Sequence, residues 1–147
     1  AIYCFSGSTR KRCEVYAIKR FREAYNSEIK QRISGIQAQA YTRMGVTIRH
    51  LSQLLQKTEA KIKLLITLSD GKPDDEGDNY RDYYGIEDTR QALLEAKRDG
   101  IHPFCITIDK TAKSYLPHLY GAVNYTVIDQ VAQLPLKISD IYRKLTT

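Results

Sequence analysis

The sequence predicts an α/β fold with a mostly parallel sheet, and two stretches of the chain carry this prediction. Residues 61–69 place five apolar residues within seven positions, and the run then stops at a polar turn formed by Asp70 and Gly71. A short, nearly continuous apolar run of this kind is typical of a strand buried on both faces, as in the middle of a parallel sheet. A second apolar strand, at residues 101–108, follows a predicted helix at residues 86–98. A strand–helix–strand passage with two apolar strands indicates a right-handed parallel crossover.

The N-terminal part of the chain predicts an antiparallel hairpin. Residues 2–6 read as a short strand, residues 7–12 as a polar turn, and residues 13–18 as a second strand rich in Val and Tyr. Apolar residues also recur at helical spacing within residues 13–25, so a helix there is the alternative. Of the two interpretations, we favour the hairpin.

Two helices are predicted after the hairpin. Residues 26–33 form a short helix that Asn26 or Ser27 caps. After a loop, residues 42–56 form a longer helix, with Thr42 as its N-cap. The apolar stripe of this longer helix consists of Met44, Ile48, Leu51 and Leu55.

A long acidic and aromatic loop is predicted at residues 73–85, and loops of this length are usually functional or disordered. The loop lacks the Asp-x-Asp-x-Asp-Gly spacing of an EF-hand, so it does not predict a calcium site of that kind. The helix at residues 86–98 then stops at Gly100. Glu87 and Asp88 fall at the start of this helix, where the helix dipole favours acids.

Three further elements complete the prediction. Residues 114–120 form a short helix or turn, and residues 123–128 form an edge strand. Residues 134–145 form the last helix, with Pro135 in its first turn. Its apolar face consists of Leu134, Ile138, Ile141 and Leu145.

The bulk composition fits one soluble domain. A length of 147 residues suits a single domain, and no apolar run approaches the roughly 18 residues that indicate a membrane span. The net charge of +6 permits binding to an acidic partner or to nucleic acid. The basic residues are scattered apart from Arg10, Lys11 and Arg12, and no nucleic-acid-binding motif is present. We therefore expect a solvated basic surface and no bound nucleic acid.

The cysteines indicate the cellular location of the chain, and its first residues indicate whether it is a piece of a longer protein. Cys4, Cys13 and Cys105 show no metal-ligand spacing, and an odd number of cysteines without a secretory signal indicates a reducing, cytoplasmic location. Cys4 and Cys13 lie on the two strands of the hairpin, but we expect no disulfide between them. The chain opens from Ala1 straight into an apolar stretch, so we expect a piece of a longer protein.

Four stretches, in order, carry a family resemblance: YTRMGVTIRH, SDGKPDD, YYGIEDTRQAL, and IHPFCITID with YLPHLYG after it. They resemble the von Willebrand factor type A domain at the C-terminal end of nitric oxide reductase activation proteins and their Rubisco-activating relatives. The resemblance covers nearly the whole chain, residues 1–147. It implies a three-layer, Rossmann-like fold whose mostly parallel sheet has an antiparallel hairpin at one edge.

The chain departs from this family pattern at its N-terminal end. Such domains begin with a strand that carries Asp-x-Ser-x-Ser, followed by a helix, and that motif supplies three of the five metal-site residues. The closest spacing here, from Cys4 to Ser8, has Cys in place of the acid. The domain is therefore expected to be N-terminally incomplete, lacking a first strand that would lie between the hairpin and the strand at residues 61–69. A missing central strand leaves two edges of unpaired backbone groups.

The resemblance also implies a metal-ion-dependent adhesion site. Asp70 would supply its last acid and Thr42 its threonine, as ligands of Mg²⁺ or Mn²⁺, and a carboxylate of a partner protein would take an open position on the ion. Two of five ligands imply weak metal binding. The alternatives are that Asp70 only caps the next element and that Thr42 only caps its helix. Asp109, at another strand end, is expected to be a turn residue.

The leading function is a non-catalytic protein-interaction module. By resemblance, it would work with a MoxR-type AAA+ ATPase to activate, or load metal into, a target such as nitric oxide reductase. A Mg²⁺-dependent phosphoryl-transfer enzyme is the first alternative, but Leu68 stands where a second acid would be needed and no phosphate-binding loop is present. Nucleic-acid binding through the basic surface is the second. His50, His102 and His118 are expected in packing or surface roles.

Overall fold

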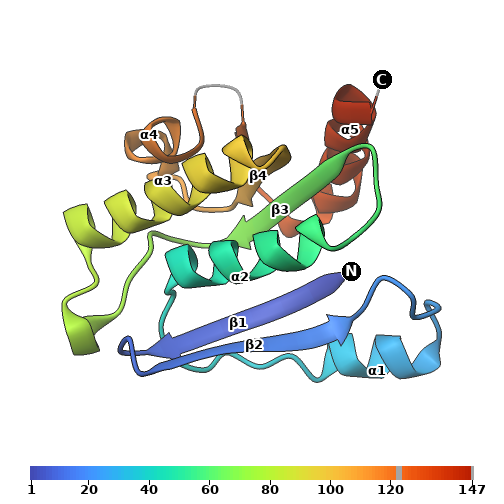
Figure 1. Ribbon diagram of the computed structural model, residues 1–147, viewed down its shortest axis with the longest axis horizontal. Coiled ribbons are helices and arrows are strands. Elements are labelled where there is room, and N and C mark those ends of the chain that lie inside the picture. The colour runs from blue at the N-terminus through green and yellow to red at the C-terminus, as the bar shows by residue number, and fades with distance from the viewer. Residues whose placement is uncertain (122–123, 147) are drawn as a thin grey trace.

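The computed structural model describes residues 1–121 and 124–146, and it contains two sheets with helices packed around them (Figure 1). The strands are β1 (Ile2–Ser8), β2 (Arg12–Lys19), β3 (Lys63–Ser69), β4 (Ile101–Thr107) and β5 (Tyr125–Val127). The α-helices are α1 (Ser27–Ser34), α2 (Met44–Gln56), α3 (Asp82–Arg98), α4 (Leu116–Tyr120) and α5 (Leu134–Thr146). Single 3-10 turns are η1 (Glu76–Asp78), η2 (Ala112–Ser114) and η3 (Val131–Gln133).

The middle layer is a parallel sheet with the strand order β3-β4-β5. Side chains alternate between its two faces, as the pleat of a strand requires. Leu65 of β3 and Cys105 of β4 belong to a core shared with α2, α3 and α4, whereas Ile66 and Phe104 belong to a second core shared with α5. The sheet is therefore covered by helices on both faces, which confirms the predicted α/β class and its three layers.

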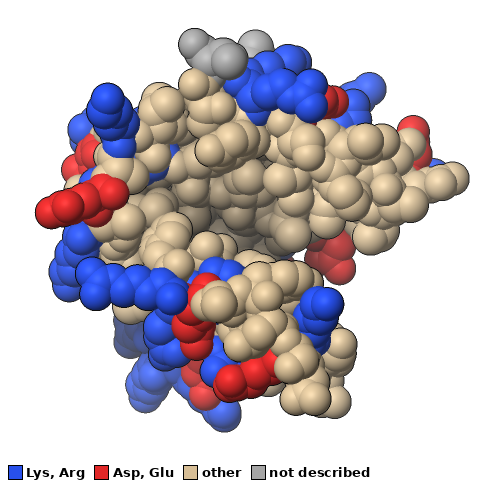
Figure 2. Space-filling view, turned by 90° about the vertical axis from the view of Figure 1, so that its right-hand side faces the viewer, with Lys and Arg blue, Asp and Glu red and all other residues tan. Residues whose placement is uncertain are grey.

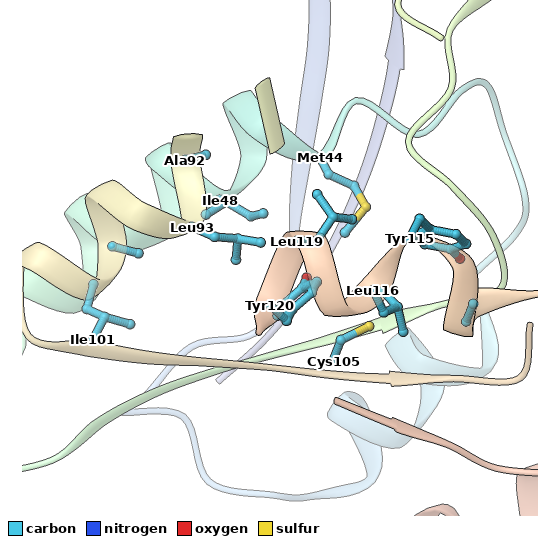
Figure 3. Close-up of a cluster of buried hydrophobic side chains, with 12 residues drawn as sticks. Met44, Ile48, Ala92, Leu93, Ile101, Cys105, Tyr115, Leu116, Leu119 and Tyr120 are labelled. Atoms are coloured by element: carbon cyan, nitrogen blue, oxygen red, sulfur yellow. The ribbon is translucent and has the colours of Figure 1, made fainter. Parts of the chain in front are cut away.

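The larger core lies between the sheet and the three helices α2, α3 and α4 (Figure 3). Met44 and Ile48 enter it from α2, and Leu93, which is fully buried, enters it from α3. α4 contributes Leu119 and Tyr120. The predicted apolar stripe of α2 thus provides one wall of the core at its N-terminal end.

The hairpin prediction is confirmed. β1 and β2 pair in antiparallel fashion, and α1 packs against β2. The Asn26 side chain caps α1 by accepting a hydrogen bond of 3.1 Å from the Ile29 amide. Cys4 faces Tyr16 across the hairpin and Cys13 faces Gly7, so the two cysteines are out of register, and all three cysteines are free.

A cleft of about 1090 Å³ separates the hairpin from the parallel sheet. β1 lines one wall, β3 lines the other, and the side chains of α2 lie between them. Figure 2 shows the cleft as a hollow with few charged side chains on its visible walls. Among the described residues no strand bridges the two sheets.

The prediction that residues 61–69 form a strand in the middle of the sheet is therefore wrong for the described residues. β3 stands at the edge of its sheet, and Leu68 is 53% exposed. The physical reason is that β3 has β4 on one side and the open cleft on the other.

Several predicted boundaries differ from the structure. α2 begins at Met44 with Arg43 as its N-cap, so the assignment of Thr42 as the cap is wrong. α3 begins at Asp82, four residues before the predicted start, which shortens the acidic loop. The predicted strand at residues 123–128 is observed as β5, and Val123 itself lies outside the described residues. The last helix and its apolar face are confirmed.

Candidate metal centre

The carboxyl end of β3 opens onto the cleft. β3 ends at Ser69, whose hydroxyl donates to the Gly71 carbonyl at 2.8 Å and accepts from the Gly71 amide at 3.3 Å. This local turn leaves the Asp70 side chain exposed directly after the strand. Thr42, which is half-buried, lines the same cleft. The structure therefore places both predicted ligands on one cavity, although they are 28 positions apart in the sequence.

Thr42 is held by its backbone rather than by a capping role. Its amide donates to the Asp74 carbonyl at 2.8 Å, and the Asp74 amide donates to the Thr42 carbonyl at 3.1 Å. The preceding residue, Tyr41, makes a similar pair of bonds with Gly7, at 2.8 and 3.0 Å. The segment before α2 is thus joined to the hairpin on one side and to the loop after Asp70 on the other.

The two side chains at this edge carry oxygen donors of the type that a hard divalent cation binds. Mg²⁺ and Mn²⁺ prefer carboxylate and hydroxyl oxygens, which Asp70 and Thr42 supply. Among residues 1–121 and 124–146, no group of three or more His, Cys, Asp or Glu side chains lies close enough to hold an ion. The two donors fit the expected metal, but by themselves they leave most of an octahedral shell to water or to other residues.

A buried ion pair lies directly beside this edge, and it was not predicted from the sequence. Arg43 Nη1 lies 2.9 Å from Oδ2 of Asp75, whose side chain is 0% exposed. Asp75 also accepts from the amides of Thr9, at 2.7 Å, and Gly77, at 2.9 Å. Burial raises the pKa of Asp75, but the bonds from Arg43 and the two amides outweigh burial, so the pKa lies below its usual range. The one signal in the sequence was the Asp-x-Gly spacing of Asp75 and Gly77, which is typical of an Asx turn.

Tyr80 packs under the same arginine. The guanidinium carbon of Arg43 lies 4.3 Å from the centroid of the Tyr80 ring, which is within range of a cation–π interaction. The Tyr80 hydroxyl donates to Asp88 at 2.6 Å and accepts from the Gly45 amide at 3.2 Å. Burial, followed by the bond to Asp88, raises the pKa of Tyr80 to about 12. This phenol therefore stays protonated and acts as a structural donor.

The prediction that Asp88 sits at a helix start is wrong, because α3 begins at Asp82 and Asp88 lies in its second turn. Asp88 faces α2, where it also accepts from Arg49 at 2.8 Å. Glu87, in the same turn, pairs with His118 and lies 3.5 Å from Arg90. The contacts between helices, and not the helix dipole, account for both acids.

Asp109 is a turn residue, as predicted. Its carboxylate accepts from the amide and hydroxyl of Thr111, both at 2.8 Å, and from the Tyr115 hydroxyl at 2.7 Å. The Tyr115 bond contributes most to holding the pKa of Asp109 below its usual range. The charge of Asp70 is among the causes that raise the pKa of Tyr115, after burial and Asp109. The oxygens of Asp109 are therefore used by bonds within its own loop.

Comparison with known proteins supports the same family. The family model of the von Willebrand factor type A domain matches residues 2–136. An uncharacterized protein of Pseudomonas aeruginosa is 46% identical over 145 residues, which cover 99% of this chain and 24% of that protein. A protein named NorD from Stutzerimonas stutzeri is 45% identical, over 90% of this chain and 22% of that protein. A protein named NorD from Brucella melitensis is 35% identical, over 99% of this chain and 23% of that protein.

The chain spans about a quarter of the length of these relatives. No solved structure matches it significantly. Within the described residues, the helices lack the length and apolarity that crossing a bilayer requires. The matched residues include the parallel sheet, the helices α2, α3 and α4 that cover one of its faces, and the strand end at Asp70. The chain therefore belongs to the von Willebrand factor type A domain family.

Proposed function

We propose that this chain is a protein-interaction module whose contact point is a metal ion at the carboxyl edge of the sheet. The observation that carries the proposal is that Asp70 and Thr42 open onto the same cleft at the end of β3. Ligand sites of open α/β sheets lie outside the carboxyl ends of the strands. Mg²⁺ or Mn²⁺ held there would keep one position for a carboxylate of a partner protein. This is a binding chemistry that requires no turnover.

The cleft between β1 and β3 is where a further strand would complete the site. Among its described lining residues, only Arg32 and Asp70 have charged side chains, so the walls suit an apolar strand. β1 and β3 are each seven residues long, and their arrows in Figure 1 point to the same side of the molecule. A strand inserted parallel to both would end beside Thr42 and Asp70. An Asp-x-Ser-x-Ser segment at that end would add the oxygen ligands that the site lacks.

The names of the relatives support an accessory role. Because relatives over nearly the whole chain are named NorD, we propose that the complete protein works in the cytoplasm with a MoxR-type AAA+ ATPase to activate, or load metal into, a target enzyme such as nitric oxide reductase. The ATPase would consume ATP, and this chain would recognise the target. Burial raises the pKa of Cys105 to about 12, so this thiol is a poor nucleophile.

The substitution Asp70→Ala in the complete protein tests this function. We expect target activation to be lost while pairing with the ATPase is retained, because only the metal-held contact is removed. Asp99→Ala is the matched control, since Asp99 is an exposed acid that precedes β4 at the opposite end of the sheet. Normal target activation by the Asp70→Ala protein would refute the metal-site mechanism.

A further inference from the structure

We propose that Arg43 and Asp75 are positioning residues that hold Thr42 at the metal edge. The term latch is used here for the buried ion pair of Arg43 and Asp75 together with Asp78. The inference rests on the proposed function for the role of Thr42. The placement of Thr42 by the latch, however, is a separate claim that is measured without any metal.

The first half of the latch is the side chain next to Thr42. Arg43 directly follows Thr42, and its side chain is only 7% exposed. Its Nη1 donates to Asp75 at 2.9 Å and to Asp78 at 3.2 Å, while the guanidinium stacks on the Tyr80 ring. These three contacts fix the position of the Arg43 side chain.

The second half of the latch is the loop that follows Asp70. Asp75 directly follows Asp74, whose backbone makes both bonds of the bridge to Thr42. Asp75 is itself fixed by backbone bonds to Tyr80, at 2.8 and 2.9 Å, and by the amide of Thr9 at the hairpin turn. The Arg10 amide donates to Asp78 in the same way. The latch thus joins the hairpin turn, the start of α2 and the acidic loop at one point.

The arrangement makes two neighbouring pairs that reinforce each other. Thr42 pairs with Asp74 through an isolated antiparallel bridge, and the residues that follow them in the sequence, Arg43 and Asp75, pair through their side chains. Breaking a buried ion pair leaves an uncompensated charge, so each partner favours the arrangement that keeps the other within reach. Supporting contacts of this kind commonly set the orientation of a metal ligand. The latch therefore sets where the Thr42 hydroxyl stands at the edge of the sheet.

The test uses the complete protein with two latch variants, Asp75→Asn and Arg43→Lys. Each is close in shape to the natural residue, and Arg43→Lys also keeps the charge, which protects folding. The control is Arg49→Met on the same helix, because Arg49 pairs with Asp88 and Glu95 at 2.8 and 2.7 Å but does not contact the bridge. Hydrogen exchange at the amides of Thr42 and Asp74, Mn²⁺ affinity and the melting temperature are measured for every variant.

We expect both latch variants to speed exchange at the Thr42 and Asp74 amides by about tenfold or more and to weaken Mn²⁺ binding by a factor of about 10–100. Arg49→Met removes partly exposed ion pairs of the same helix and should leave both quantities within about twofold. The inference is overturned if the two amides stay protected in the latch variants, or if Arg49→Met exposes them equally.

Asp70→Ala separates failure of the latch from failure of the proposed function. If the natural protein and Asp70→Ala bind Mn²⁺ equally, or neither binds it, the metal site is wrong, and the exchange rates still decide whether the latch positions Thr42. If Asp70→Ala alone loses Mn²⁺ while the latch variants bind normally, the metal site stands and the positioning role is wrong.

Discussion

At the scale of single residues, Asp75 is a buried carboxylate that links the hairpin turn, the start of α2 and the acidic loop. Its side chain is fully buried, and it receives bonds from one guanidinium and two backbone amides. Removing one partner of such a pair typically lowers the free energy of unfolding by about 3–5 kcal/mol, because an uncompensated charge stays buried. Asp70, in contrast, is exposed and free to meet an ion.

The pH dependence of stability should report on Asp75. Its pKa is lowered in the folded state, so the unfolded state binds more protons as the pH falls. Its contribution to stability is present above the unfolded pKa of about 3.9 and is lost as the pH falls through the folded pKa. Urea unfolding followed by circular dichroism should therefore show the free energy of unfolding falling below about pH 4.

Asp109 and other carboxylates contribute to the same decline, so the comparison is with Asp75→Asn. The variant should be less stable at pH 7 and should lose less additional stability between pH 5 and pH 3. An equally steep acid decline in the variant would mean that Asp75 is not held ionised by the latch.

Gly45 marks a close approach between α2 and α3. A Cβ at this position would lie 1.9 Å from Oδ2 of Asp88 and 3.0 Å from the Tyr80 hydroxyl. We expect Gly45→Ala to lower the free energy of unfolding by about 1–3 kcal/mol, because this overpacking outweighs the better helix propensity of Ala. Thermal unfolding measures the change. Gly71→Ala is the control, with no heavy atom within 4 Å of its added Cβ, and an equal effect of both would contradict the packing argument.

At the scale of elements, α5 alone covers the second face of the parallel sheet within the described residues. Ile141 is 6% exposed and packs with Phe104, Ile106 and Ile128. Ile141→Ala should lower the free energy of unfolding by about 2–5 kcal/mol, because it leaves a cavity at this contact. Chemical denaturation measures the effect. Leu136, on the same helix, is 72% exposed, and Leu136→Ala should change stability by no more than about 0.5 kcal/mol. Similar losses for both variants would mean that α5 is not docked on the sheet.

The elements with strong periodicity were predictable from the sequence. β3 forms where its apolar run predicted a strand, Met44, Ile48 and Leu55 of the α2 stripe pack into the larger core, and the predicted face of α5 packs on the sheet. The start of α3 was missed because it carries no capping signal: its N-cap, Arg81, makes no side-chain cap bond, and Asp82 has a positive φ of 42°. The residues around Asp82 therefore contain no local pattern that would predict the start of α3.

The candidate site was predictable only in part. Asp70 followed from the rule that ligand sites lie at the carboxyl ends of strands. The family resemblance suggested Thr42 as a ligand, but its bridge to Asp74 was not predictable, because it joins residues that are 32 positions apart. The partner of Asp75 is equally distant, and any of the chain's Lys or Arg residues would have fitted the sequence. Long-range pairs of this kind become visible only when the fold is known.

At the scale of the whole molecule, the central feature is the cleft with a strand edge on each side. Edge strands present unpaired N–H and C=O groups that readily accept another strand. The proposed first strand would join the two sheets into one and bring further oxygen ligands to Asp70 and Thr42. In this proposal the same strand completes both the sheet and the metal site.

Calorimetric titration with Mg²⁺ and Mn²⁺ tests this account most directly. The chain is compared with a version extended upstream to include the proposed first strand, each with and without Asp70→Ala. The account predicts that the extended form binds metal, that Asp70→Ala abolishes this binding, and that the present chain binds weakly or not at all. An extended form that binds no metal, or that binds it equally well with Asp70→Ala, would contradict the account.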